Sequence, residues 1–231
     1  MTSALILKYV LVVLLSYLLG SLNFSIIFSK LLAKKDIRES GSGNAGATNM
    51  LRTYGKRFAV ITMIGDILKV AAAIMITFAI LGAPMKYLFA IPESAQEIRQ
   101  IMLYKEFAGF FAVLGHIFPV FFKFKGGKGM AACTGMVILV DWRIALILFV
   151  IFVIVIAVSK WVSLGSIVIA VFYPVLIIAF YQDWLLCAVA LLFTIIVIVA
   201  HRENIKRLIK GTENKISLSS EIGRASCRER V

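Results

Sequence analysis

The sequence predicts an all-α, polytopic membrane protein with seven transmembrane helices. The first observation is composition: 61% of the 231 residues are hydrophobic, whereas soluble domains contain about 45–50% apolar residues. The second is a succession of seven apolar runs whose lengths suit helices that have lipid as their solvent. The third is the uneven distribution of Lys and Arg among the connecting segments. Together they exclude an ordinary soluble fold.

The apolar runs lie at about residues 4–29, 58–82, 106–122, 131–140, 144–158, 164–181 and 184–200. The fourth and fifth are short, because a spanning helix needs about 20 residues, and residues 131–158 could instead form one long helix. The sequence VDWRI decides between these alternatives. Asp141 and Arg143 would be costly in hydrocarbon, and Trp142 suits an interface. We therefore predict two helices with a break at this point.

Lys and Arg residues gather on one side of the predicted membrane. Seven spans put the two termini on opposite sides. Sixteen Lys and Arg lie in residues 30–57, 123–128, 159–163 and 201–220, whereas the opposite connections, which include residues 83–105, hold five. Because loops rich in Lys and Arg stay in the cytoplasm, we expect the N-terminus outside and the C-terminus in the cytoplasm.

Charge and cysteine content exclude several classes of partner. The formal net charge is +13, but the cations cluster beside apolar runs, which favours anionic ligands and membrane surfaces over nucleic acid. Cys133, Cys187 and Cys227 show no paired spacing, so we expect neither a disulfide nor a zinc site. Carboxylates are scarce in the predicted cytoplasmic loops, which argues against a two-metal site. We expect no metal and no cofactor.

GSGNAGATNMLR, residues 41–52, is the first of four polar motifs on the predicted cytoplasmic side. Gly41, Gly43 and Gly46 would allow positive φ and turn backbone N–H groups toward one point. A turn followed by a helix N-cap is the simpler interpretation, but Thr, Asn and Arg at fixed offsets favour a phosphate site, since Arg supplies a bidentate fork. The candidate phosphate-binding residues are Ser42, Gly43, Asn44, Thr48, Asn49 and Arg52.

GHIFPVFFKFKGGKGMA, residues 115–131, is the second motif. A Gly-Gly-Lys-Gly turn that opens an apolar helix predicts an anion site, because bare backbone N–H groups, the helix N-terminus and the lysine would converge. It is not a nucleotide-hydrolysing P-loop, which requires Gly where this chain has Phe122 and Ser or Thr where it has Gly129. The candidate phosphate-binding residues are Gly126, Gly127, Lys128 and Gly129.

SKWVSLGS, residues 159–166, is a short turn that leads into an apolar run. Ser163 and Ser166 are three residues apart, so on a helix they would share a face. Helix capping is the alternative role for serines at this position. We treat Ser166 as a candidate phosphate ligand and Ser163 as a supporting residue.

HRENIKRLIKGTENKI, residues 201–216, is the fourth motif. On a helix, His201 and Asn204 would lie on one face. A basic amphipathic tail on the membrane surface is the alternative, but it does not explain a His and an Asn at the mouth of the last span. We take these two residues as the catalytic candidates.

Several residues are expected to position the phosphate-binding groups without binding the ligand themselves. Asp66 and Lys69 are i and i+3 in the second predicted span, where a charge pair is costly and marks a functional candidate. A mutual ion pair that supports a nearby loop is equally compatible with this spacing. His116 is expected to be structural or interfacial. The supporting residues are Asp66, Lys69, His116, Ser163 and Glu213.

In this order and at these spacings, the four motifs resemble those of the bacterial integral-membrane glycerol-3-phosphate acyltransferases that use acyl phosphate as donor. The resemblance covers residues 5–216. It implies a seven-helix fold in the bacterial inner membrane with its active site at the cytoplasmic face. Two departures are Ala132, where the family commonly has Thr, and Ala200, where Arg often precedes the histidine.

The resemblance also implies a reaction: transfer of an acyl group from acyl phosphate to the 1-hydroxyl of glycerol 3-phosphate, giving lysophosphatidate and phosphate, the first acylation of phospholipid synthesis. Acyl phosphate is already activated, so the enzyme needs no nucleophile and must position two phosphate-bearing substrates. We expect direct transfer without an acyl-enzyme, by a monomer in the lipid bilayer. The family's binding and catalytic groups correspond to Ser42, Thr48, Arg52, the Gly126–Gly129 turn with Lys128, Ser166, His201 and Asn204.

Two other functions remain open from the sequence. A transporter of an organic phosphate would also have a basic cytoplasmic face, but no internal repeat is visible and the polar motifs lie near loops rather than mid-span. Another membrane enzyme of lipid phosphates would need metal-binding carboxylates or a nucleophile. No Gly-x-Ser-x-Gly elbow occurs, and neither His begins the His-x4-Asp pattern of the common glycerolipid acyltransferases.

The last residues, EIGRASCRERV at 221–231, are polar and unlike the preceding sequence. They match the translation of a widely used sequencing adapter, so we interpret them as a non-native tail. We expect residues 1–220 to form a single membrane domain. A disordered basic tail is the alternative and would leave the other expectations unchanged.

Overall fold

The computed structural model describes residues 2–216, and over this range the regular structure is all-helical. The predicted all-α class is confirmed, and the predicted tail lies outside the described residues. The helices are α1 (Ser3–Gly20), α2 (Phe24–Ala33), α3 (Ala47–Tyr54), α4 (Lys56–Leu81), α5 (Ala95–Ile117), α6 (Met130–Val140), α7 (Trp142–Ser159), α8 (Val162–Tyr181), α9 (Trp184–Ala200) and α10 (Arg202–Ile209), with short 3₁₀ helices η1 (Ile37–Glu39), η2 (Met85–Leu88) and η3 (Val120–Phe122).

Five helical segments are long and apolar enough to cross a membrane: Ser3–Ala33, α4, Ala95–Phe122, α7 and α8. A sixth is added if α9 and α10, which meet at a bend of 62°, count as one span. Helix α6 has 11 residues and is about 17 Å long, shorter than the roughly 30 Å hydrocarbon core. Each predicted apolar run therefore contains a helix, and five or six of them meet the length required for a crossing.

The break between α6 and α7 falls where the sequence predicts it. Helix α6 ends at Val140 and α7 begins at Trp142. Asp141 lies between them, where its carboxylate accepts a hydrogen bond from the Arg143 backbone N–H at 2.9 Å and pairs with the Arg143 guanidinium at 2.8 Å. The prediction of two helices in place of one long helix is confirmed.

One predicted boundary is wrong, and one predicted run contains a break. The third span was expected to start at residue 106, but α5 begins at Ala95. Two of the charged residues before or at that point have partners from distant helices or loops: Arg99 pairs with Asp183, and Glu106 accepts a hydrogen bond from the Tyr173 hydroxyl at 2.8 Å. The first run, 4–29, is interrupted after Gly20, and α2 restarts with the Asn23 side chain as its N-cap.

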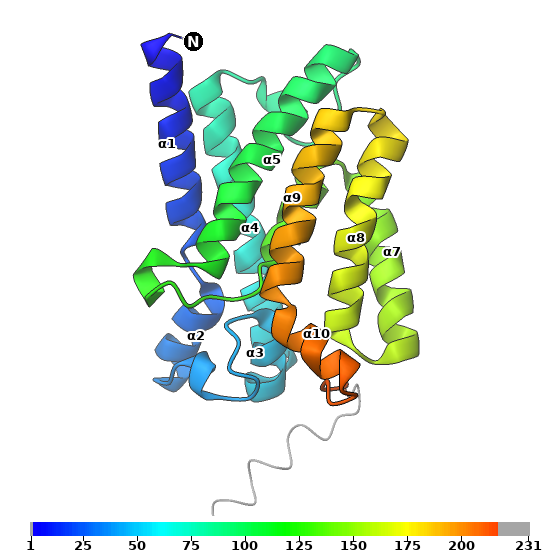
Figure 1. The fold of residues 1–231 in the computed structure, drawn as a ribbon. Coiled ribbons are helices and arrows are strands. Elements are labelled where there is room, and N and C mark those ends of the chain that lie inside the picture. The colour runs from blue at the N-terminus through cyan, green and yellow to red at the C-terminus, as the bar shows by residue number, and fades with distance from the viewer. Residues whose placement is uncertain (1, 217–231) are drawn as a thin grey trace, which may run out of the picture.

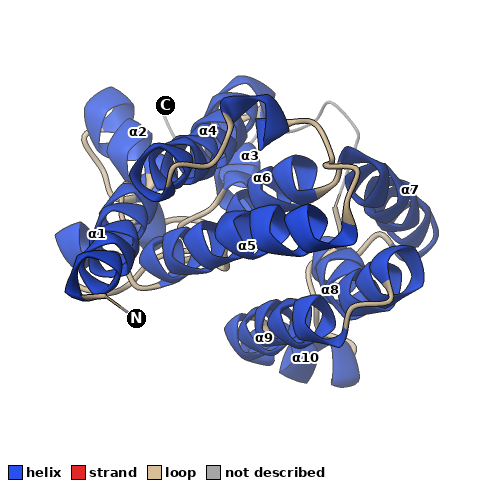
Figure 2. Cartoon of the chain, turned by 90° about the horizontal axis from the view of Figure 1, so that it is seen from above, coloured by secondary structure: helices blue, strands red, loops and turns tan. Residues whose placement is uncertain are grey.

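The long helices pack in two groups, and the candidate site lies where the two groups meet. Helices α1, α4, α5 and α6 pack on one another, and α7, α8 and α9 form a second group (Figure 2). Close approach of α1 and α5 depends on Gly20, where a Cβ would collide with the Ala112 backbone. The outward faces stay apolar and exposed, as at Phe149 (60%) and Val158 (82%), which fits contact with lipid tails.

Candidate active site

The four polar motifs meet at one end of the helix bundle. Figure 1 shows α2, α3 and α10 together at the end opposite the N-terminus. A cavity of about 680 Å³ opens there. Residues of all four motifs line it: Ser42, Gly43, Asn44, Thr48, Asn49, Arg52, Lys128, Gly129, Ser163, Ser166, His201, Asn204 and Glu213, together with Asp66 and His116. The predicted residues Gly126, Gly127 and Lys69 lie behind this lining.

The glycines of the first motif shape the loop before α3. Gly41 and Gly43 have positive φ, +57° and +70°, as predicted, whereas Gly46 is extended at φ −162°, so that part of the prediction is wrong. The N–H groups of Gly43 and Gly46 donate to Ser40 O and Asn44 O, at 3.0 and 3.1 Å. They stabilise the loop and are not available to a ligand.

Asn49 has a different role from the one predicted. Its side chain is buried, and its amide donates to Ile37 O at 3.1 Å and Ser40 O at 2.9 Å. Its Oδ1 accepts the Ser42 backbone N–H at 2.8 Å. An Asn amide has two N–H donors, so none is left for a phosphate. Asn49 holds the loop that carries Ser42 toward the cavity.

The Gly-Gly-Lys-Gly turn is bound to the end of α5. Gly126 N–H donates to Ile117 O at 3.0 Å and Gly127 N–H to His116 O at 3.2 Å, so the prediction of bare N–H groups at these positions is wrong. The sequence could not show that α5 ends with carbonyls facing this turn. Lys128 and Gly129 do line the cavity, and Gly129, at φ +80°, is the N-cap of α6.

A Gly127→Ala substitution is expected to impair substrate binding. The added Cβ would collide with Ala45 O and His116 Nε2, and overpacking of this kind costs about 1–3 kcal/mol. The collision would push Lys128 away from the first motif, so KM for a phosphate-bearing substrate should rise roughly tenfold. Steady-state kinetics measure this. Gly82→Ala is the control, because its methyl meets open space, and its φ of +76°, which Gly127 does not share, adds a backbone cost that makes the comparison stricter. An equal rise in KM there would contradict the steric explanation.

Lys128 belongs to a partly buried polar network with the fourth motif. Its ammonium donates to Asn204 Oδ1. Asn204 Nδ2 donates to Glu213 Oε1 at 2.9 Å, and Arg207 Nε donates to Glu213 Oε2 at 2.8 Å. Burial, together with the charges of Arg207 and Arg52, lowers the pKa of Lys128 to about 8. The network therefore concentrates cationic charge at the cavity and favours an anion.

Arg207 lines the cavity although the sequence did not place it among the site residues. It lies three residues after Asn204 on α10, and residues at this spacing share a helix face. That spacing was the available signal.

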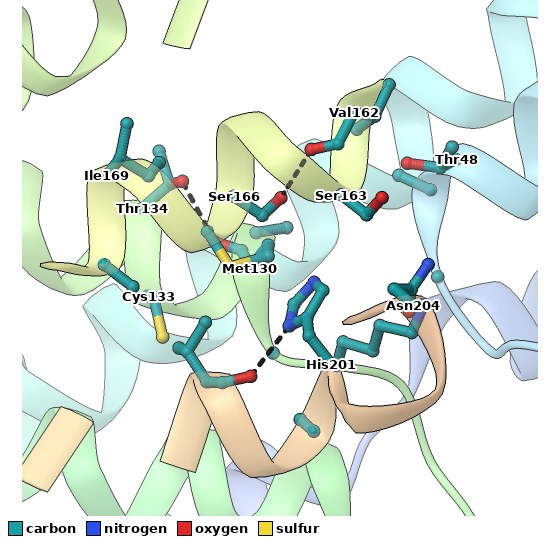
Figure 3. A pocket seen from close by; sticks show the side chains of 18 of the residues that line it. Thr48, Met130, Cys133, Thr134, Val162, Ser163, Ser166, Ile169, His201 and Asn204 are labelled. Atoms are coloured by element: carbon teal, nitrogen blue, oxygen red, sulfur yellow. Dashed lines mark hydrogen bonds between the residues drawn. The ribbon is translucent and has the colours of Figure 1, made fainter. Parts of the chain in front are cut away.

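His201 follows the last residue of the apolar helix α9, at the bend before α10. Its Nδ1 lies 2.8 Å from Val197 O, and because a carbonyl can only accept, Nδ1 carries the proton. Burial and the charge of Lys128 lower the pKa of His201 to about 4. The ring is therefore neutral near pH 7, with an unprotonated Nε2 that faces the cavity (Figure 3).

The two serines of α8 lie across the cavity from the loop motifs. Ser163 and Ser166 are buried, and Ser166 Oγ donates to Val162 O at 3.0 Å. Figure 3 shows both hydroxyls near the space that His201 and Thr48 also border. The predicted shared helix face is confirmed.

Asp66, Lys69 and His116 form a buried cluster beside the cavity. Lys69 Nζ is 2.8 Å from Asp66 Oδ1 and 2.9 Å from His116 Nδ1, and it donates to Leu22 O at 2.8 Å. The His116 ring lies against Gly127. The structure thus shows the mutual ion pair and its position next to the Gly-Gly-Lys-Gly turn.

The cavity has two chemically different parts. Cations and hydroxyls gather at the end of the bundle, whereas the part between the helices is apolar. Among the described residues, no group of three or more His, Cys, Asp or Glu is placed to hold a metal ion. The apolar lining includes Met136, Val137, Leu148, Phe152, Ile169 and Phe193. The cavity suits a molecule with an anionic head and an apolar chain.

The lowered pKa of Lys128 predicts a pH dependence of binding. Below about pH 8 the ammonium is charged, and above it the free protein loses this charge. Phosphate monoesters stay dianionic above their second pKa of about 6, so KM for a phosphate-bearing substrate should rise as pH passes 8. Lys128→Arg keeps its charge and should abolish the rise. A flat KM profile in the unmodified protein would contradict this expectation.

The fold and cavity define an integral membrane protein whose site accepts an anionic amphiphile. Comparison with known proteins gives the family. Residues 10–211 match the sequence model of the family described as "Glycerol-3-phosphate acyltransferase", and the chain belongs to that family. The predicted resemblance is confirmed, and membership supports an acyltransferase role.

Relatives and solved structures match nearly the whole chain. Glycerol-3-phosphate acyltransferase 2 of Bacillus anthracis is 40% identical over 209 residues, which cover 90% of this chain and 98% of that protein. A glycerol-3-phosphate acyltransferase of Coxiella burnetii is 39% identical over 211 residues, covering 91% and 99%. The crystal structure of PlsY (YgiH), an integral membrane glycerol 3-phosphate acyltransferase, matches in its glycerol 3-phosphate form with a TM-score of 0.75 and 33% identity, covering 90% and 96%.

Proposed function

We propose that this protein transfers an acyl group from acyl phosphate to the 1-hydroxyl of glycerol 3-phosphate, giving lysophosphatidate and inorganic phosphate. The observation that carries the proposal is the single cavity that joins a cation-rich end, lined by all four motifs, to an apolar part between the helices. An acyl phosphate needs both environments at once. Family membership and the PlsY structures support glycerol 3-phosphate as the acceptor.

The cations and hydroxyls of the cavity would bind the two substrate phosphates. Arg52 offers a planar fork for phosphate oxygens and Lys128 a point charge, and both line the cavity. The first turn of α6, which starts after Gly129, presents its positive end to the same space. The hydroxyl donors that complete this proposed site are Ser42 and Thr48, with Asn44 beside them, and Ser166, whose single O–H would have to turn away from Val162 O to donate to a phosphate.

The reaction proceeds in this proposal by direct transfer. The acceptor hydroxyl oxygen attacks the acyl carbonyl carbon, the bond from that carbon to the phosphate oxygen breaks, and the hydroxyl proton leaves with the departing phosphate. His201 Nε2 accepts a hydrogen bond from the hydroxyl and orients it; a pKa of about 4 makes the ring a weak proton acceptor. Asn204 positions Lys128. Positioning and charge stabilisation then supply the rate enhancement.

The proposed topology has seven crossings, with α6 as a short one, the N-terminus outside and the C-terminus in the cytoplasm of a bacterial cell. The N-terminus lies at the end of the bundle opposite α10 (Figure 1), which supports an odd number of crossings. The cation-rich segments surround the cavity end, and the positive-inside rule places such segments in the cytoplasm. We propose that the protein acts as one domain and as a monomer in the inner membrane.

The test is an assay of the purified full chain in lipid vesicles. Acyl phosphate and labelled glycerol 3-phosphate, with a chelator and no magnesium, should give lysophosphatidate and phosphate in equal amounts, and acyl-coenzyme A or acyl carrier protein should not replace the donor. Uptake of glycerol 3-phosphate without acylation would favour the transporter. A strict metal requirement would favour another lipid-phosphate enzyme, and a trapped covalent acyl-enzyme would overturn direct transfer.

A further inference from the structure

Arg38 joins two loops that are far apart in the sequence, and it does not line the cavity. Its Nη1 donates to Phe122 O at 3.0 Å and to Lys125 O at 2.8 Å. Its Nε and Nη2 donate to the two carboxylate oxygens of Asp36, at 2.9 and 2.7 Å. One guanidinium therefore binds the segment before the first motif to the segment before the Gly-Gly-Lys-Gly turn.

Asp36 fixes the orientation of this guanidinium. It is the N-cap of η1 and accepts the Arg38 backbone N–H at 3.0 Å. Lys30 lies 3.5 Å from its carboxylate. A bidentate Arg–carboxylate pair has a defined plane, so the remaining Nη1 is aimed at the two carbonyls. Asp36 and Arg38 act as one unit.

The loop that Arg38 contacts contains two residues with strained backbone. Lys123 and Phe124 both have φ +58°, a left-handed conformation that costs a non-glycine residue roughly 1 kcal/mol or more. Both side chains are exposed. The contacts from Arg38 fall on the carbonyls at either side of these two residues, Phe122 and Lys125, and so hold the strained turn closed.

Each of the two segments that Arg38 joins continues, within a few residues, to a side chain of the proposed phosphate site. Lys128 follows three residues after Lys125, and Ser42 four residues after Arg38. Between Arg38 and Ser42, the Asn49 amide ties Ser40 O to α3. We propose that Arg38 is a positioning residue that sets the distance between Ser42 and Lys128, and thereby the affinity for a phosphate-bearing substrate. The activity readout of this inference rests on the proposed function.

Kinetics of Arg38→Ala are the first test. The free energy lost with hydrogen bonds from a charged group corresponds to a change in a binding constant of roughly tenfold or more. We expect this loss to appear as a rise in KM for glycerol 3-phosphate, with a smaller change in kcat. A purely structural role would instead lower the active fraction and leave KM unchanged. Arg57→Ala is the control, since Arg57 is exposed, lies in the first turn of α4 next to α3 and does not line the cavity; its KM should stay at the wild-type value.

Chemical rescue separates positioning from folding. Methylguanidinium added to purified Arg38→Ala should restore part of the affinity, because it can occupy the site between Asp36 and the two carbonyls, whereas methylammonium should not. Arg38→Lys should stay impaired, since a single ammonium cannot replace the planar fork. If Arg38→Ala does not fold, Arg38→Gln, which keeps an N–H donor for a loop carbonyl, takes its place in the same assays.

Hydrogen exchange provides a readout that is independent of catalysis. In Arg38→Ala, the Gly126 and Gly127 amides, which donate to the end of α5, should exchange faster, while amides of α7 should not. Wild-type KM and exchange in the variant, or a loss of activity that methylguanidinium does not restore, would overturn the inference. An inactive wild type with faster exchange in the variant would count against the proposed function and support the positioning role.

Discussion

Replacing Lys128 by Ala is expected to lower kcat/KM by roughly 100-fold or more, the range found when one donor to a developing oxyanion is removed. Lys128 lines the cavity and donates a hydrogen bond to Asn204. Burial and the charges of Arg207 and Arg52 lower its pKa. Its loss would remove charge from the place where, in the proposed reaction, the leaving phosphate forms. Turnover of acyl phosphate by the purified variant in vesicles measures the effect.

Two variants control this experiment. Lys125→Ala removes a cation three residues away whose side chain is exposed and lies outside the cavity lining, so it should turn over at nearly the wild-type rate. Lys128→Arg keeps the charge but replaces a compact ammonium by a larger fork, and should retain an intermediate activity. Near-normal turnover by Lys128→Ala, with normal expression, would show that Lys128 is not a ligand of the reacting phosphate.

The sequence predicted the α-helical class and the position of the four motifs because both depend on local composition. Charges at Asp141 and Arg143 marked the break between α6 and α7, since their carboxylate–guanidinium pair is local. The start of α5 was missed because Arg99 is satisfied by Asp183, 84 residues away. Local composition shows the charge but not its distant partner.

The same limit applies within the site. Gly126 and Gly127 led to the prediction of N–H groups that are free to bind an anion. In the folded protein these N–H groups donate to carbonyls at the end of α5, and the sequence alone does not show that the turn lies against α5. Arg38 gave no signal at all, because its acceptors are backbone carbonyls at Phe122 and Lys125. Backbone acceptors carry no residue type that a sequence pattern could reveal.

Replacing His201 is expected to lower kcat by roughly 100-fold, the cost of misplacing a reacting group by about 1 Å. The structure makes the two ring nitrogens separable. Nδ1 is bound to Val197 O, which fixes the ring, and Nε2 faces the cavity. His201→Asn keeps a donor near the Nδ1 position, and His201→Gln places a polar atom near the Nε2 position. Their kcat values, measured with saturating substrates, test which nitrogen acts.

If Nε2 orients the acceptor hydroxyl, His201→Gln should retain more activity than His201→Asn, because the Gln oxygen can accept the same hydrogen bond. The opposite order would show that His201 acts through Nδ1, which bonds to Val197 O and holds the bend between α9 and α10. A pKa of about 4 also means that the ring stays neutral from about pH 6 upward, so kcat should show no inflection near pH 6.5, the ordinary pKa of His. An inflection there that disappears in His201→Gln would make the ring a proton carrier and overturn transfer of the proton to the departing phosphate.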